Sequence, residues 1–130
     1  MGINLTIMPL KDKESLKKAL VYTYVRLCFV SDYNILGQIG NVDGESAIPD
    51  SGIEAVVKTY SLPKEMLVHK YDDEGMNKTR DNPFGEEMVY TLAGEFRKIK
   101  APRKTSSVNK AILAYVRKLD KETPIILEWR

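Results

Sequence analysis

The clearest hydrophobic pattern in the chain lies between residues 106 and 129. Apolar side chains recur there at spacings of three and four, as on one face of an amphipathic helix, at Val108, Ala111, Ile112, Tyr115, Val116 and Leu119. Asn109 falls on the other, polar side. A hydroxyl of Ser106 or Ser107 can cap this helix by accepting a hydrogen bond from a first-turn N–H. Pro124 prevents the helix from continuing, and the apolar residues 125 to 129 predict a short buried strand.

The beginning of the chain shows the two-residue alternation of a strand. Ile3, Leu5 and Ile7 alternate with Asn4, Thr6 and Met8, which predicts a half-buried strand that ends at Pro9. Residues 11 to 20 predict one or two helical turns. Residues 21 to 29 alternate as well, and their aromatic and β-branched content favours a strand. A helix over residues 14 to 29 is the alternative, because four apolar positions also line up at helical spacing: Leu16, Leu20, Tyr24 and Leu27.

The middle of the chain is punctuated by turn residues. We expect a turn at Ser31 and Asp32, with residues 33 to 39 returning as the second arm of a hairpin. Loops are predicted at 40–52 and 72–85, a short helix or strand at 53–60, strands at 66–71 and 88–90, and a helix at 92–99. Strands early and helices late indicate one α+β domain over residues 1 to 130. Its sheet is expected to be largely antiparallel, with two helices in the C-terminal half.

Composition narrows the class of protein. A chain of 130 residues with 43% hydrophobic and 29% charged residues is expected to fold around a core. The net charge of +2 is too small to imply nucleic-acid binding by itself. Charge is unevenly distributed, however, since residues 72 to 87 are acidic and residues 97 to 118 carry only basic charges. This arrangement suits an internal contact, a head-to-tail dimer or a charged partner.

Catalytic chemistry has little support in the sequence. The single cysteine, Cys28, fits a reducing cytoplasm, and no apolar run has the length of a membrane span, so we expect a cytoplasmic protein without a membrane segment. The single histidine, His69, lacks the context of a catalytic triad, and one histidine with one cysteine is too few for a typical zinc site. We therefore expect no metal, no cofactor and no enzymatic activity.

The basic loop before the predicted helix is the best candidate ligand site. Helix N-termini attract anions through free N–H groups and the helix dipole, and cations and hydroxyls add to this attraction. The candidate ligand-binding residues are Arg103, Lys104, Thr105, Ser106 and Ser107. The same serines can simply cap the helix, which is the commoner arrangement.

Two further groups of residues suggest binding surfaces. Tyr22, Tyr24 and Arg26 would share one face of a strand, where tyrosine rings could stack on bases. Four acidic residues of the polar loop could contact a protein partner or, less characteristically, a hard cation: Asp72, Asp73, Glu74 and Asp81.

Three segments give the chain a resemblance to a known group of proteins. They are residues 31–39 (SDYNILGQI), residues 71–75 through 81–85 (YDDEG and DNPFG) and residues 123–129 (TPIILEW). In this order they resemble small uncharacterised proteins of bacteriophages and mobile elements. The resemblance implies an accessory protein and supplies no mechanism.

The function expected from these features is non-enzymatic binding of an anionic small ligand, such as a nucleotide or another phosphate compound. Two alternatives remain: a protein-interaction or inhibitor protein that uses the acidic loop and the tyrosine face, and nucleic-acid binding through residues 97 to 118. A homo-oligomer is compatible with each of them.

Overall fold

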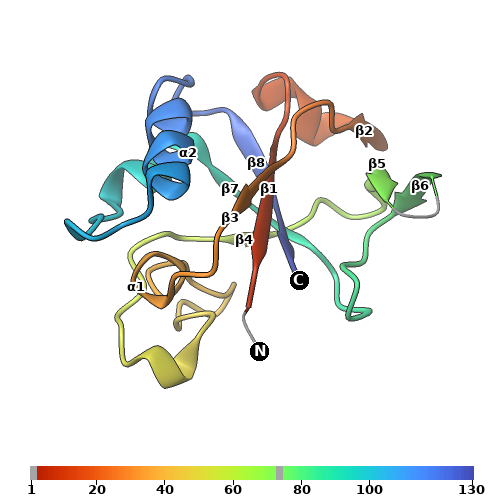
Figure 1. Ribbon diagram of the computed structural model, residues 1–130. Coiled ribbons are helices and arrows are strands. Elements are labelled where there is room, and N and C mark those ends of the chain that lie inside the picture. Colours follow the sequence, from red (N-terminus) through yellow and green to blue (C-terminus); the bar gives the residue numbers. More distant parts are fainter. Residues whose placement is uncertain (1–2, 73–74) are drawn as a thin grey trace.

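The computed structural model describes residues 3–72 and 75–130 (Figure 1). Its strands are β1 (Leu5–Pro9), β2 (Leu20–Tyr22), β3 (Leu27–Phe29), β4 (Tyr60–Ser61), β5 (Leu67–Asp72), β6 (Gly75–Thr79), β7 (Val89–Leu92) and β8 (Pro124–Trp129). Its α-helices are α1 (Tyr33–Leu36) and α2 (Ser107–Arg117), and its 3₁₀ helices are η1 (Lys13–Lys17), η2 (Pro49–Ser51) and η3 (Ala93–Lys98). No helix in the described ranges is long and apolar enough to cross a membrane.

The strands form two sheets. The larger sheet has five strands in the order β3-β1-β8-β7-β4, and every neighbouring pair in it is antiparallel. The smaller sheet has the order β2-β5-β6, in which β2 and β5 are parallel and β5 and β6 form an antiparallel hairpin. The expected α+β class with a largely antiparallel sheet is confirmed.

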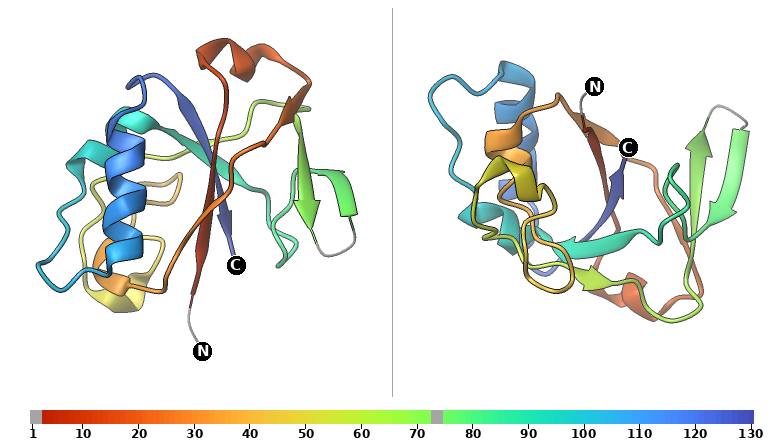
Figure 2. Two further views of the ribbon diagram at one scale, coloured as in Figure 1. Left: turned by 45° about the horizontal axis from the view of Figure 1, so that its top comes forward. Right: turned by 90° about the horizontal axis from the view of Figure 1, so that it is seen from below.

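The larger sheet is covered on both faces. Helices α1 and α2 lie on one side of it and the smaller sheet lies on the other, as Figure 2 shows. Leu5 and Ile7 pack with the helices in one core, whereas Met8 packs in a second core beneath the smaller sheet. The expectation of a half-buried first strand was therefore wrong, because alternate residues of β1 enter two different cores.

Residues 21 to 29 do not form one continuous strand, and they form no helix either. The chain leaves the smaller sheet after Tyr22 and joins the larger sheet at Leu27. Thr23 marks the exit, because its backbone N–H and its hydroxyl both donate to the carbonyl oxygen of His69, at 3.2 and 3.0 Å. The two-residue alternation of side chains continues through residues 23–26, between the two sheets, and it therefore predicted a single strand.

Two other expectations were wrong. Residues 33 to 39 do not return as a hairpin arm, because the Asp32 carboxylate accepts hydrogen bonds from the N–H groups of Asn34 and Ile35 and starts α1 instead. The segment 72–85 is not entirely loop, because Gly75 begins β6 and its φ of 103° suits only glycine.

Helix α2 confirms the predicted cap and corrects the predicted face. The Ser106 hydroxyl accepts a hydrogen bond from the N–H of Asn109 at 3.1 Å. The buried residues of α2 are Asn109, Ile112, Leu113 and Val116, whereas Val108 and Tyr115 are exposed. Asn109 is buried because its side-chain amide bonds both the N–H and the carbonyl of Val30, each at 2.9 Å.

Candidate functional site

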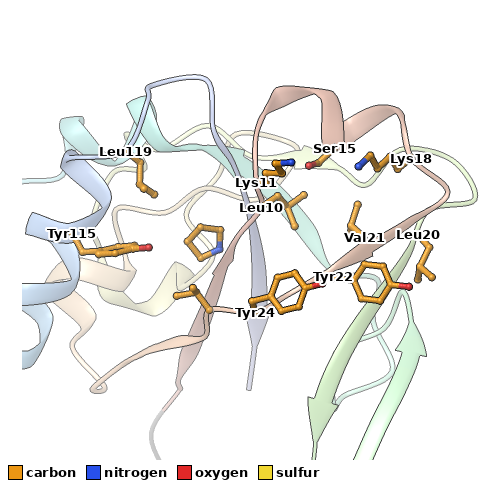
Figure 3. A pocket seen from close by; sticks show the side chains of 12 residues that line it. Leu10, Lys11, Ser15, Lys18, Leu20, Val21, Tyr22, Tyr24, Tyr115 and Leu119 are labelled. Carbon is orange, nitrogen blue, oxygen red and sulfur yellow. The ribbon is translucent and has the colours of Figure 1, made fainter.

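A cavity lies between the C-terminal half of α2 and the segment from the end of β1 to residue 25 (Figure 3). We call it the tyrosine pocket. Its volume is about 470 Å³, and its lining residues are Pro9, Leu10, Lys11, Ser15, Lys18, Leu20, Val21, Tyr22, Tyr24, Val25, Tyr115 and Leu119. Ligand pockets are commonly a few hundred cubic ångströms in volume and are mostly apolar with a few polar groups, which matches this lining.

Three tyrosines surround the pocket. The rings of Tyr22 and Tyr24 stack with their centroids 6.1 Å apart and their planes 13° from parallel. The His69 ring contacts the Tyr22 ring edge-on, with the two ring centroids 4.9 Å apart and the ring planes at 76°. Tyr24 is 89% exposed, so its outer face is free to stack on a planar ligand. Tyr115 points toward the pocket from α2, on the opposite side (Figure 3).

The cationic side of the pocket comes from the stretch around η1. Lys13 pairs with Glu122 at 3.4 Å and Lys17 pairs with Glu14 at 3.0 Å, and neither of these lysines lines the pocket. Lys11 and Lys18 do line it, and neither has an ion-pair partner among residues 3–72 and 75–130.

These two lysines act on the same part of the pocket. Figure 3 shows their ammonium groups on either side of Ser15, which is buried and lines the same cavity. Two unpaired cations beside a hydroxyl form an environment that favours an anion such as phosphate. The pocket thus combines an aromatic side with a cationic side.

The predicted anion site at the start of α2 is only partly supported. Arg103 and Lys104 are exposed, and so is Ser107. The Ser106 hydroxyl is used by the cap, and the Thr105 hydroxyl is buried without a partner within the part of the chain that the structure describes. Capping therefore accounts for Ser106 without a ligand.

Residues 103–107 also lie apart from Tyr115 of the tyrosine pocket. Ser106 and Tyr115 are separated along α2 by about 13 Å, given a rise of roughly 1.5 Å per residue. Part of the basic segment serves the fold, since Arg97 donates to the carbonyl of Leu119 at 3.2 Å and Arg117 donates to the carbonyl of Ile99 at 2.9 Å. None of the residues 103–107 lines the tyrosine pocket.

Arg26 is absent from the tyrosine face on which it was predicted. Its guanidinium donates to the carbonyl of Tyr71 and pairs with Glu128 at 3.2 Å. The side chain of Glu128 is only 1% exposed, and it pairs with the buried ammonium of Lys70 as well. Arg26 therefore belongs to an ion cluster between the two sheets.

The predicted acidic site is described only in part. Asp73 and Glu74 lie outside the described residues, and so does the side chain of Asp72, although its backbone ends β5. Asp81 is exposed and its backbone pairs with Glu87. Among the residues that the structure describes, no three His, Cys, Asp or Glu side chains are grouped so that they could hold a metal ion.

Sequence reasoning identified two tyrosines of the pocket and missed the lysines. Lys11, Ser15 and Lys18 are spaced by four and three, which would place them on one side of the helical turns expected there. That spacing was the sequence signal that could have placed these three residues at one site. Tyr115 was assigned to the buried face of its helix, and its role at the pocket depends on the exact rotation of α2.

Compared with known protein families, curated proteins and solved structures, the chain shows no match. The resemblance to bacteriophage proteins therefore stays a prediction.

Proposed function

We propose that this chain is a non-enzymatic binding protein whose tyrosine pocket holds a small anion with an aromatic part, of the nucleotide class. The observation that carries the proposal is a difference among four neighbouring lysines, of which two form ion pairs within the described ranges and two do not. Lys13 and Lys17 pair with carboxylates, whereas Lys11 and Lys18, at the pocket, pair with none of those that the structure describes. Charges left unpaired beside a concave surface are available to a ligand.

The aromatic side of the pocket would bind the aromatic part of the ligand. Tyr24 can stack on a nucleobase with its exposed ring face, and base stacking on aromatic side chains contributes about 1–3 kcal/mol in other proteins. A nucleoside monophosphate carries both chemistries within a size that suits a cavity of about 470 Å³. Sequestering such a nucleotide would suit the accessory role that the resemblance to phage proteins implies.

Isothermal titration calorimetry with adenosine monophosphate, adenosine and inorganic phosphate tests the proposal, followed by other nucleotides and cyclic dinucleotides. We expect the monophosphate to bind at least about tenfold more tightly than adenosine or phosphate alone. Lys11→Gln combined with Lys18→Gln should reduce its affinity to that of adenosine. Tyr24→Ala should weaken adenosine and the monophosphate alike, because the base loses its stacking partner.

Two control variants locate the site. Lys64→Gln removes an exposed cation outside the pocket and should leave affinity unchanged. Lys104→Gln tests the start of α2 and should also have no effect. Loss of binding in Lys104→Gln with normal binding in the Lys11 and Lys18 variant would transfer the site to the helix entrance. Absence of heat for every nucleotide up to about 10 mM would refute nucleotide binding altogether.

A further inference from the structure

The turn before β7 approaches the end of β8 (Figures 1 and 2). Residues of both segments line a second cavity, distinct from the tyrosine pocket. We call it the acidic pocket. Its volume is about 460 Å³, and its lining residues are Ile3, Asn41, Val42, Ala47, Asn82, Phe84, Glu86, Glu87, Val89 and Trp129. Two carboxylates line it and no lysine, arginine or histidine does.

One of the two carboxylates has no counter-charge among the described residues. Glu87 faces Arg80, with nitrogen–oxygen distances of 3.4 and 3.5 Å. Glu86 is exposed and forms no ion pair within the described ranges. Asp43 and Glu45 add negative charge from the neighbouring loop. An uncompensated negative rim over an apolar floor favours an occupant that is both cationic and apolar.

The turn that carries Phe84 is held rigidly. The Asn82 side-chain oxygen accepts hydrogen bonds from the N–H groups of Phe84 and Glu86, at 2.9 and 3.1 Å. The Asn82 N–H donates to the Glu86 carbonyl at 2.8 Å, and Gly85 takes a φ of 82°. Phe84 is nevertheless 64% exposed. Because the backbone of this turn is already fixed, an exposed aromatic ring on it costs less ordering entropy on binding than one on an unconstrained loop.

We propose that the acidic pocket docks a segment of a partner protein that presents a lysine or arginine beside apolar side chains. Charge complementarity at Glu86 selects the cation, and the cation can also face the aromatic rings of Phe84 and Trp129. A protein segment is favoured over a free amine because Phe84 and Val42, which is 51% exposed, stand on the rim. A small amine inside the pocket would leave both in water, whereas a segment covers them.

Trp129 supplies a built-in reporter, because it is the only tryptophan in the chain and it lines this pocket. The probe is a capped peptide of alternating leucine and arginine, and its control is the same peptide with the neutral isostere citrulline. The arginine peptide should change tryptophan emission saturably, and the citrulline peptide should bind at least about tenfold more weakly. Added salt should weaken the arginine peptide alone.

Matched variants place the contact. Glu86→Gln should weaken the arginine peptide about tenfold, and Phe84→Ala should do the same. Both side chains are exposed, so the fold should survive. Glu65→Gln removes an exposed carboxylate outside the pocket and should change nothing.

The other occupants are outcomes that overturn the proposal. Binding of arginine amide as tightly as the peptide would assign the pocket to a free organic cation. Self-association that Glu86→Gln abolishes, seen by sedimentation without any peptide, would assign it to a second copy of the chain. Equal binding of both peptides, or unchanged emission up to about 1 mM arginine peptide, would refute charge-directed docking.

Discussion

Asn109 shows how one polar side chain can serve as part of the core. It lies on α2 with no exposed surface and bonds the N–H and the carbonyl of Val30, just after β3. The amide thus satisfies two backbone groups that the strand leaves unpaired. Helical periodicity classed Asn109 as polar and outward, because the sequence contains no sign of the backbone groups that it meets.

Replacing Asn109 by alanine should lower the free energy of unfolding by about 2–3 kcal/mol, because both backbone groups of Val30 lose their partner inside the protein. Urea denaturation followed by circular dichroism measures this loss. Asn34→Ala, at an exposed position of α1, serves as the control and should stay within about 0.5 kcal/mol of the unaltered protein. Equal effects of the two changes would contradict the role of the buried amide.

Glu95 should make stability depend on acid pH. Burial by itself would raise the pKa of this carboxyl, but hydrogen bonds from the Lys98 ammonium at 2.9 Å and the Lys58 N–H at 2.8 Å outweigh it and lower the pKa below its ordinary value. A lowered pKa stabilises the fold above the ordinary value, and that contribution disappears as pH falls through the lowered one.

Glu95→Gln should therefore destabilise the protein at neutral pH by about 1 kcal/mol or less, because the Lys98 ammonium is solvent-exposed. The difference from the unaltered protein should shrink below about pH 4. Urea denaturation at a series of pH values measures it. A difference that stays constant with pH would show that the carboxylate charge is not responsible.

At the scale of elements, helix α2 and its cap followed directly from the sequence. Ser106, the apolar spacing and the following Pro124 are local signals, and local signals are visible in a sequence. The break between β2 and β3 was not visible. It depends on distant partners, because β2 pairs with β5 whereas β3 pairs with β1, and Arg26 between them pairs with Glu128.

Ser106→Ala should destabilise the protein by about 1 kcal/mol, because the Asn109 N–H loses the hydroxyl that caps it. Ser107→Ala is the matched control at the next residue, which is exposed, and should change stability by less than about 0.5 kcal/mol. Thermal unfolding of the two variants side by side makes the comparison. If Ser107→Ala were the more harmful change, the cap would be misassigned.

At the scale of the whole molecule, Glu128 joins the two sheets. It lies on β8 of the larger sheet and pairs with Lys70 on β5 of the smaller one, while Arg26 reaches it from the crossing segment. The sequence pattern predicted that Glu128 lies in a buried strand and that Lys70 lies in a strand over residues 66–71. It gave no sign of their pairing, because the two residues meet only when the sheets stack.

Glu128→Gln should lower the free energy of unfolding by about 3–5 kcal/mol, because the buried Lys70 ammonium loses its charged partner. The double variant Glu128→Leu, Lys70→Met should lose clearly less free energy of unfolding than Glu128→Gln alone, since replacing Lys70 by methionine removes the buried charge. Chemical denaturation of both variants tests this. A double variant as unstable as the single one would indicate that the loss comes from packing rather than from the uncompensated charge.

The sequence predicted the α+β class, α2 and the core strands, and it pointed to Tyr22 and Tyr24. It missed the cationic side of the tyrosine pocket for a physical reason. Lysines resemble one another in a sequence, and only the positions of Glu14 and Glu122 reveal which of them are neutralised. A site defined by unpaired charge can be recognised only after the paired charges are known.

The pairing of β1 with β8 has a consequence for synthesis on the ribosome. The two strands are neighbours at the centre of the larger sheet, and the N–H of Asn4 donates to the carbonyl of Arg130 at 3.0 Å. A nascent chain that has not yet emerged past residue 129 holds β1 without its central neighbour, so both cores stay open. Neither core can close before residues 124–129 have left the ribosome, so the preceding chain exposes apolar surface until β8 is available to pair with β1.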